Sequence, residues 1–138
     1  MRAPFSTPCF PAACIAAVLV LALSPGQAAR AFSPEGVECL DRAGDGAQRL
    51  VCADIELKAQ AKALAAAVAK LKAAGDNRAD DLLAKTQAAW EAHRDAHCAW
   101  MADRLRRDAT AQRLEHLLCL AGATESRVQE LDDYQNVP

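Results

Sequence analysis

CAWMADRLRRDATAQRLEHLLC, residues 98–119, is the stretch that decides how the chain folds. Apolar residues recur at helical spacing on both sides of Arg104–Asp108, so this charged run predicts a turn with Asp108 capping the next helix. In an antiparallel hairpin built on this turn, Cys98 and Cys119 lie at similar heights on facing helices. We therefore expect them to form a disulfide.

Outward from the hairpin, the apolar pattern predicts three long helices. The first starts with a capping box at Asp45 and Gln48 and ends at Gly75, which we expect to be a left-handed cap. The second begins at Asp76-Asn77. Gly122 leaves open whether the third is one helix or two. The predicted inward faces are Leu50, Leu57, Ala61, Leu64, Val68 and Leu71; then Leu83, Thr86, Trp90, His93, His97, Trp100 and Met101; then Leu114, Leu117, Leu118, Ala121, Val128 and Leu131.

The remaining sequence agrees with a helical domain. Residues 32–44 contain Pro34, Gly36 and Gly44, and we expect them to be irregular. No proline occurs from 35 to 137, and no run of alternating β-branched residues indicates a strand. The predicted fold is all-α: a disulfide-stapled bundle of three to four amphipathic helices with one long antiparallel hairpin.

Residues 1–28 have the organisation of a secretory signal peptide. Arg2 precedes an apolar run, Ala12–Leu23, that is too short to span a bilayer, and cleavage is expected after Ala28 or Ala31. We expect a periplasmic or secreted protein with one domain over 32–134, a tail over 135–138, and no stable membrane insertion once the signal is removed.

The cysteines divide between the leader and the domain. Two of the 6 cysteines, Cys9 and Cys14, leave with the signal peptide. The other four are Cys39, Cys52, Cys98 and Cys119, and they allow three disulfide connectivities in an exported chain. Cys39 precedes the first long helix and Cys52 lies in its first turns, so the favoured pairs are Cys39–Cys52 and Cys98–Cys119.

Two spaced motifs carry a family resemblance. Gln87-x-x-Trp90-x-x-x-Arg94-Asp95-x-x-Cys98 is followed by Cys119-x-x-x-x-Thr124-x-x-Arg127-x-x-x-Leu131. Together with Cys39 and Cys52, this arrangement resembles the LprI-type lysozyme-inhibitor domain, a family of small, exported, mostly helical bacterial proteins. The chain departs from the usual family pattern at 57–61, which lacks a Leu-Asn-x-x-Tyr segment, and at 104–108, which lacks a Gly-Gly turn.

The motif residues suggest an architectural role. Arg94 follows Trp90 by one helical turn, so its aliphatic stem can pack along the indole. Arg94 or Arg127 can also pair with a neighbouring carboxylate and tie two helices together. We expect Gln87, Trp90, Arg94, Asp95, Thr124, Arg127 and Leu131 to be structural.

His93 and His97 allow two interpretations. Their spacing places both imidazoles on one helical face, where zinc or copper could bind with help from His116. Alternatively, they are partly buried histidines beside the tryptophans. The segment between them lacks the glutamate of a metalloprotease helix, and no other cofactor is indicated.

Arg104, Arg106 and Arg107 form a short basic cluster in the predicted turn. Such a cluster is either a solvated turn or a contact surface for a partner. The family resemblance implies lysozyme, whose cleft contains a catalytic acid and a carboxylate with which a guanidinium would pair.

Composition and motifs exclude several other functions. The formal net charge is −2, which gives no global reason for nucleic-acid binding. The chain has no G-x-S-x-G motif and no glycine-rich phosphate loop, so we do not expect an enzyme. The expected function is an exported binding protein that inhibits lysozyme or another cell-wall hydrolase by blocking its glycan cleft. The alternatives are a periplasmic zinc- or copper-binding module and a structural cell-envelope module.

Overall fold

Four helices make up nearly all of the described chain. A computed structural model describes residues 32–104 and 108–135; the predicted leader and the tip of the predicted turn lie outside these ranges. The helices are α1 (Pro34–Arg42), α2 (Gly46–Ala74), α3 (Asn77–Arg104) and α4 (Ala109–Gln135). Within these ranges there is no strand, and no helix is long and apolar enough to cross a membrane. The predicted all-α fold is confirmed.

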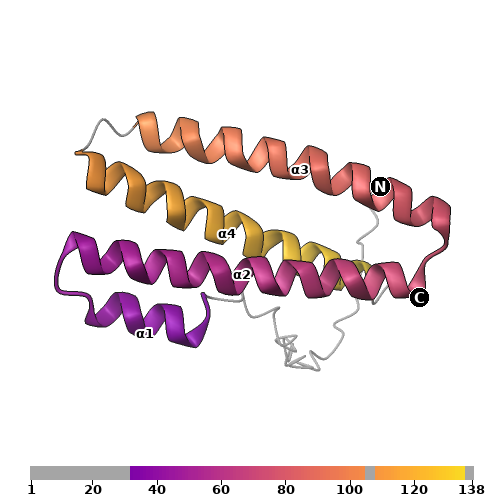
Figure 1. Cartoon of the computed structure of the whole chain (residues 1–138), viewed down its shortest axis with the longest axis horizontal. Coiled ribbons are helices and arrows are strands. Elements are labelled where there is room, and N and C mark those ends of the chain that lie inside the picture. The colour runs from indigo at the N-terminus through magenta and orange to yellow at the C-terminus, as the bar shows by residue number, and fades with distance from the viewer. Residues whose placement is uncertain (1–31, 105–107, 136–138) are drawn as a thin grey trace, which may run out of the picture.

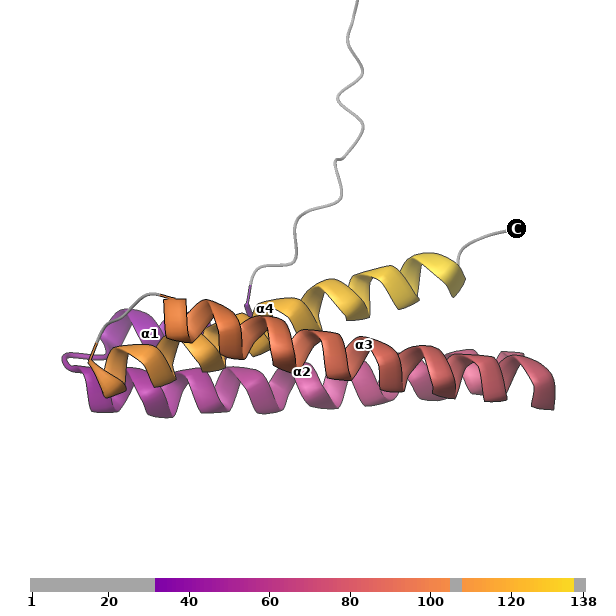
Figure 2. The ribbon, with the colours of Figure 1, turned by 90° about the horizontal axis from the view of Figure 1, so that it is seen from above.

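The helices lie side by side in an order that differs from their order in the chain. Figure 1 shows α4 between α2 and α3, with α1 against the opposite side of α2, and the contacts between elements agree with this arrangement. Figure 2 shows the C-terminal end of α4 standing out of the plane of α2 and α3. Helix α3 is therefore an edge helix that packs against α4 to form the predicted antiparallel hairpin.

Both favoured disulfides are present. Cys39–Cys52 joins α1 to the start of α2, with the Cα atoms 5.4 Å apart. Cys98–Cys119 joins α3 to α4, with the Cα atoms 5.6 Å apart. Each bond fastens one of the two outer helices of the layer to a neighbouring inner helix.

Short polar side chains begin each long helix. Asp45, Asp76 and Asp108 accept hydrogen bonds from the backbone N–H groups of Gln48, Ala79 and Ala111, at 2.8, 2.8 and 3.0 Å. These caps satisfy N–H groups that have no partner within the helix, as predicted from the sequence. The expected left-handed cap at Gly75 is wrong: its φ is −91°, so the chain leaves α2 in an extended conformation.

The core lies where the second half of α2 meets the second half of α4. Leu64, Ala67, Val128 and Leu131 are buried there, and Leu83 and Trp90 of α3 pack against them. Ala53, Ala102 and Ala121 are also buried. Small side chains at such positions let helix backbones approach closely but bury little apolar area, so disulfides and polar contacts matter more for this domain.

The prediction that the segment before α2 is irregular is wrong, because Pro34–Arg42 forms helix α1. Ser33 caps this helix by accepting a hydrogen bond from the Gly36 N–H at 3.0 Å, and Pro34 stands at its first position, where no N–H is needed.

The inward faces of two long helices also differ from prediction. On α2 the buried face turns toward Ala53, Glu56 and Gln60, because α1 and its N-terminal cap dock there; Leu57 is only half-buried and Ala61 is exposed. On α3, Thr86, His93, His97 and Trp100 are exposed, while Gln87, Cys98 and Ala102 are buried.

On α4, Ala121, Val128 and Leu131 are buried as predicted, whereas Leu114, Leu117 and Leu118 are half-buried. Gly122 does not interrupt the helix, which runs unbroken from Ala109 to Gln135.

Candidate functional site

Trp90 lies at the centre of a cluster formed by the sequence motif. The guanidinium carbon of Arg94 is 5.0 Å from the centroid of the Trp90 ring, and that of Arg127 is 5.8 Å from it. Both distances are within the range for cation–π attraction. Helix α3 contributes Trp90 and Arg94, and α4 contributes Arg127, so the ring joins two helices.

Hydrogen bonds extend this cluster across the α3–α4 interface. Arg127 Nε donates to Gln87 Oε1 at 2.7 Å, and Arg127 Nη1 donates to Glu130 Oε2 at 2.6 Å. Arg94 Nη1 donates to Thr124 Oγ1 at 3.2 Å, and Thr124 Oγ1 donates to the Leu120 carbonyl at 2.7 Å.

The environment of these groups is enclosed. Arg127 is 5% exposed, and Gln87 and Thr124 are also buried. Asp95 pairs with Arg94 at the protein surface, with a nitrogen–oxygen distance of 2.7 Å, and Leu131 belongs to the core. The structure therefore brings six of the seven motif residues to the α3–α4 interface or the adjoining core, and leaves Asp95 exposed beside Arg94.

A second polar cluster surrounds Glu56, which the sequence patterns did not indicate. Its side chain is fully buried and accepts hydrogen bonds from Ser33 N and from Gln60 Nε2, at 3.0 and 2.7 Å. Ser33 Oγ also donates to Glu56 Oε2. Gly36 lies against the same carboxylate, with no room for a side chain. This cluster fastens the start of α1 to α2.

The basic turn contributes one described arginine. Arg104 is exposed at the last position of α3, and its guanidinium carbon lies 5.5 Å from the ring centroid of Trp100. The indole is 55% exposed, so the pair forms a surface feature at the end of the hairpin. Arg106 and Arg107 lie outside the described residues.

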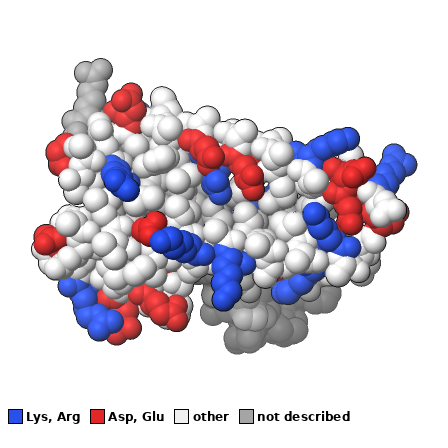
Figure 3. Space-filling model, viewed as in Figure 1, with Lys and Arg blue, Asp and Glu red and all other residues white. Residues whose placement is uncertain are grey.

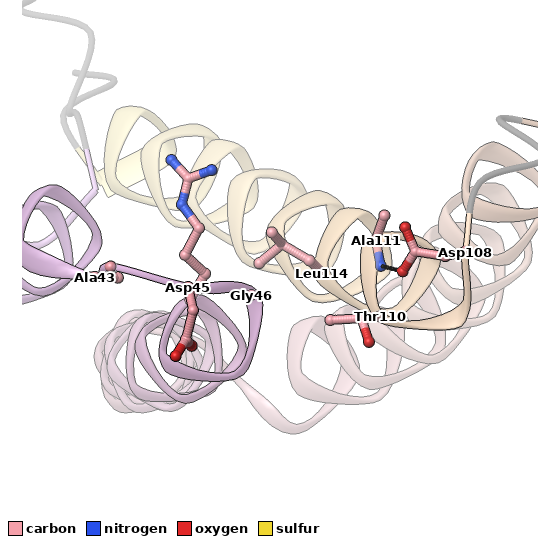
Figure 4. A pocket seen from close by; sticks show the side chains of 9 residues that line it. Ala43, Asp45, Gly46, Asp108, Thr110, Ala111 and Leu114 are labelled. Carbon is pink, nitrogen blue, oxygen red and sulfur yellow. Dashed lines mark hydrogen bonds between the residues drawn. The ribbon is translucent and has the colours of Figure 1, made fainter.

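A shallow pocket opens at the same end of the molecule, between the start of α2 and the start of α4. Its volume is about 340 Å³, and Figure 4 shows Asp45 at one wall and Asp108 and Thr110 at the other. Both aspartates use a carboxylate oxygen to cap their helices. Because the two carboxylates serve as caps, the pocket does not resemble a site for acid–base chemistry.

The histidines do not form the suggested metal site. His93 and His97 stack on the exposed surface of α3, with ring centroids 6.0 Å apart and planes at 8°. Among the described residues, no group of three histidine, cysteine or acidic side chains could hold a metal ion, so His116 does not complete a site with them. The alternative of partly buried histidines is also wrong, since both rings are exposed.

Charge is mixed over the face shown in Figure 3. Lys and Arg side chains follow α2, with acidic side chains among them and toward both ends. The exposed lysines of α2 are Lys58, Lys62, Lys70 and Lys72. This face is not a continuous basic surface of the kind that binds nucleic acid.

Comparison with protein families identifies one match. Residues 39–131 match the family described as "Lysozyme inhibitor LprI". The matched region begins at the first disulfide cysteine and ends at the core residue Leu131, so it includes both disulfides and the Trp90 cluster. Searches of curated proteins and of solved structures each gave no match.

Proposed function

The chain belongs to the lysozyme inhibitor LprI family, and from this we propose that it binds a lysozyme or a related muramidase and blocks the glycan cleft. The family match over 39–131 is the observation that carries this proposal. The two disulfides agree with it, because such bonds persist in oxidising compartments outside the cytoplasm, where muramidases act.

The proposed contact surface is the end of the molecule at which α3 ends and α4 begins. A lysozyme cleft carries two catalytic carboxyl groups, and an arginine placed among them forms charge-assisted hydrogen bonds. Arg104 is exposed at this end, and Arg106 and Arg107 follow it in the sequence. Cys98–Cys119 lies close behind them and holds the two helices together, so little conformational freedom would be lost on binding.

Turnover of a chromogenic or cell-wall substrate by c-type lysozyme tests the function. The oxidised protein should inhibit the enzyme in proportion to its concentration. The Arg106→Ala/Arg107→Ala variant should inhibit at least tenfold more weakly, since each lost charge-assisted contact is worth about 1.5–3 kcal/mol.

A matched control separates the effect of the contact surface on inhibition from the effect of total charge. Lys58→Ala/Lys62→Ala removes the same charge from the exposed side of α2 and should inhibit like the wild type at high salt, where long-range attraction is screened. Absence of inhibition by the wild-type protein, tested on c-type lysozyme and on a bacterial muramidase, would disprove the function. Equal inhibition by the wild type and the arginine variant would disprove the role of the turn alone.

A further inference from the structure

A surface pocket reaches one of the two disulfides. The pocket lies between α1 and the start of α2 and has a volume of about 380 Å³. Cys39 and Cys52 form part of its wall, and the other lining residues are Arg42, Ala43, Gln48 and Val51. Because a thiolate attacks disulfide sulfur, a pocket with a disulfide in its wall is a place where a thiol can react.

The other disulfide is held between two long helices. Cys98–Cys119 joins α3, of 28 residues, to α4, of 27 residues, and Cys98 is fully buried. The helices distinguish the two bonds, since Cys119 is half-buried, as Cys39 is. The cluster around Trp90 joins α3 to α4 independently of sulfur. Opening a path to Cys98–Cys119 therefore requires separating the whole hairpin, which is less favourable than moving one short helix.

Helix α1 is short enough to be released on its own. It has 9 residues and packs against α2 (Figure 1). A helix of this length is not stable by itself in water. Hydrogen bonds from Ser33 to Glu56 fasten its start, and the bond from Cys39 to Cys52 fastens its second half. Loss of the disulfide removes the only covalent tie of that second half to α2.

We propose that Cys39–Cys52 is a redox switch. Thiols that enter the pocket reduce this bond ahead of Cys98–Cys119, and its reduction releases α1 from α2 while the α3–α4 hairpin stays folded. Release uncovers the face of α2 that carries Glu56 and Gln60, both buried in the oxidised protein. Accessible disulfides of this kind are the ones that respond to redox conditions. The switch does not depend on lysozyme binding.

The exposure of the two cysteines decides the point of attack. Cys39 is half-buried, whereas Cys52 is only 3% exposed, so the thiolate attacks Cys39 Sγ. A sulfur–sulfur bond forms between the attacker and Cys39, the bond to Cys52 breaks, and Cys52 leaves as a thiolate that takes a proton from solvent. A second thiol of the attacker then displaces Cys39 in the same way. The dithiol is oxidised to a disulfide, and the chain gains two electrons and two protons.

Alkylation under native conditions tests the order of reduction. The oxidised protein is incubated with reduced glutathione or with a thioredoxin-type dithiol protein, quenched at intervals with iodoacetamide, and mapped by peptide mass spectrometry. Cys39 and Cys52 should be labelled at least tenfold faster than Cys98 and Cys119. Whichever reactant acts faster identifies the kind of thiol that the pocket admits. Equal labelling of the two pairs, faster labelling of the second pair, or no reduction by either reactant would overturn the proposal.

The mixed disulfide tests the point of attack, and two tryptophan variants test the route. With glutathione, the trapped adduct should be on Cys39, and an adduct on Cys52 would overturn this assignment. Val51→Trp narrows the pocket and should slow reduction severalfold. Ile55→Trp, at a side chain 43% exposed one turn further along α2, is the matched control and should be reduced at the wild-type rate. Denaturing urea should remove the difference. Equal rates for the two folded variants would overturn the pocket as the route.

Hydrogen exchange tests the release of α1. In protein with only Cys39–Cys52 reduced, and without alkylation, exchange should quicken over 34–42 and stay slow in α3 and α4. Addition of oxidised glutathione should restore slow exchange over 34–42. Exchange over 34–42 that stays slow after reduction, that becomes equally fast in all four helices, or that does not slow again on reoxidation would overturn the switch.

Discussion

Gly36 is the residue whose side chain is most restricted by its surroundings. A methyl group at this position would overlap the Glu56 carboxylate, which Ser33 and Gln60 hold in place. Alanine improves helix propensity by about 1 kcal/mol, but displacing Glu56 breaks several buried hydrogen bonds worth about 1 kcal/mol each. We expect Gly36→Ala to lower the free energy of unfolding by about 1–2 kcal/mol in urea denaturation.

The matched control for this substitution is Gly44→Ala. A methyl group at Gly44 would meet Gln48 Oε1 at an ordinary distance of 3.6 Å, so we expect no loss of stability. Equal stability of the two variants would show that Glu56 can move without cost.

Arg127 is the cation on which the Trp90 cluster depends. It is buried and donates to Gln87 and Glu130, so Arg127→Ala leaves the buried Gln87 oxygen without its donor. Leaving such a group unsatisfied costs about 1–3 kcal/mol, and we expect that loss in the free energy of unfolding.

Arg127→Lys tests the geometry of this cluster, because lysine keeps the charge but cannot donate to both partners in a fixed fork. It should fall between the wild type and Arg127→Ala. We expect lysozyme inhibition at saturating protein to be unchanged in both variants while they remain folded, because the cluster is enclosed. A selective loss of inhibition would instead place Arg127 in the binding surface.

Among the elements, α1 depends most on a covalent link. Its fastenings to α2 are Cys39–Cys52 and the Glu56 cluster. Closing a loop of 13 residues stabilises a protein by about 3 kcal/mol in the chain-entropy estimate. We expect Cys39→Ala/Cys52→Ala to unfold α1 locally. Hydrogen exchange should therefore quicken over 34–42 and stay slow in α3 and α4.

Cys98→Ala/Cys119→Ala is the comparison for that variant. It removes the link between α3 and α4, so faster exchange should appear in the hairpin instead of in α1. If the two double variants gave the same exchange pattern, the helices would unfold as one cooperative unit.

For the individual helices, the sequence predicts where the long helices lie better than it predicts which face of each helix is buried. The aspartate caps and the Cys98–Cys119 hairpin follow from local signals: capping residues act on the next turn, and paired cysteines must face each other. Helix α1 was predictable in part, since Ser33 and Pro34 are a cap and a favoured first residue, but its glycines suggested a loop.

The buried face of α2 could not be read from apolar periodicity. Glu56 and Gln60 are buried because α1 folds back on them, a long-range contact that no local pattern reports. For the candidate site, the motif predicted which residues would gather around Trp90. The exposure of His93, His97 and Trp100 required knowing that α3 is an edge helix.

For the whole molecule, the proposed lysozyme complex combines a net acidic protein with a basic contact surface. The full chain has a formal charge of −2, and loss of Arg2 with the leader would make it one unit more negative. A basic lysozyme would be attracted at long range by the net charge, whereas the arginines act only at contact. We expect the association rate to fall about tenfold from low to high salt, with a smaller change in the dissociation rate.

Lys58→Glu/Lys62→Glu tests the long-range part of this attraction, because it adds negative charge on the exposed side of α2, away from the turn. Stopped-flow measurements should show faster association at low salt and the wild-type rate at high salt, where charges beyond about 3 Å are screened at 1 M. Arg106→Ala/Arg107→Ala should instead raise the dissociation rate at both salt concentrations. If the lysine variant associated more slowly, the basic turn and not the net charge would govern the encounter.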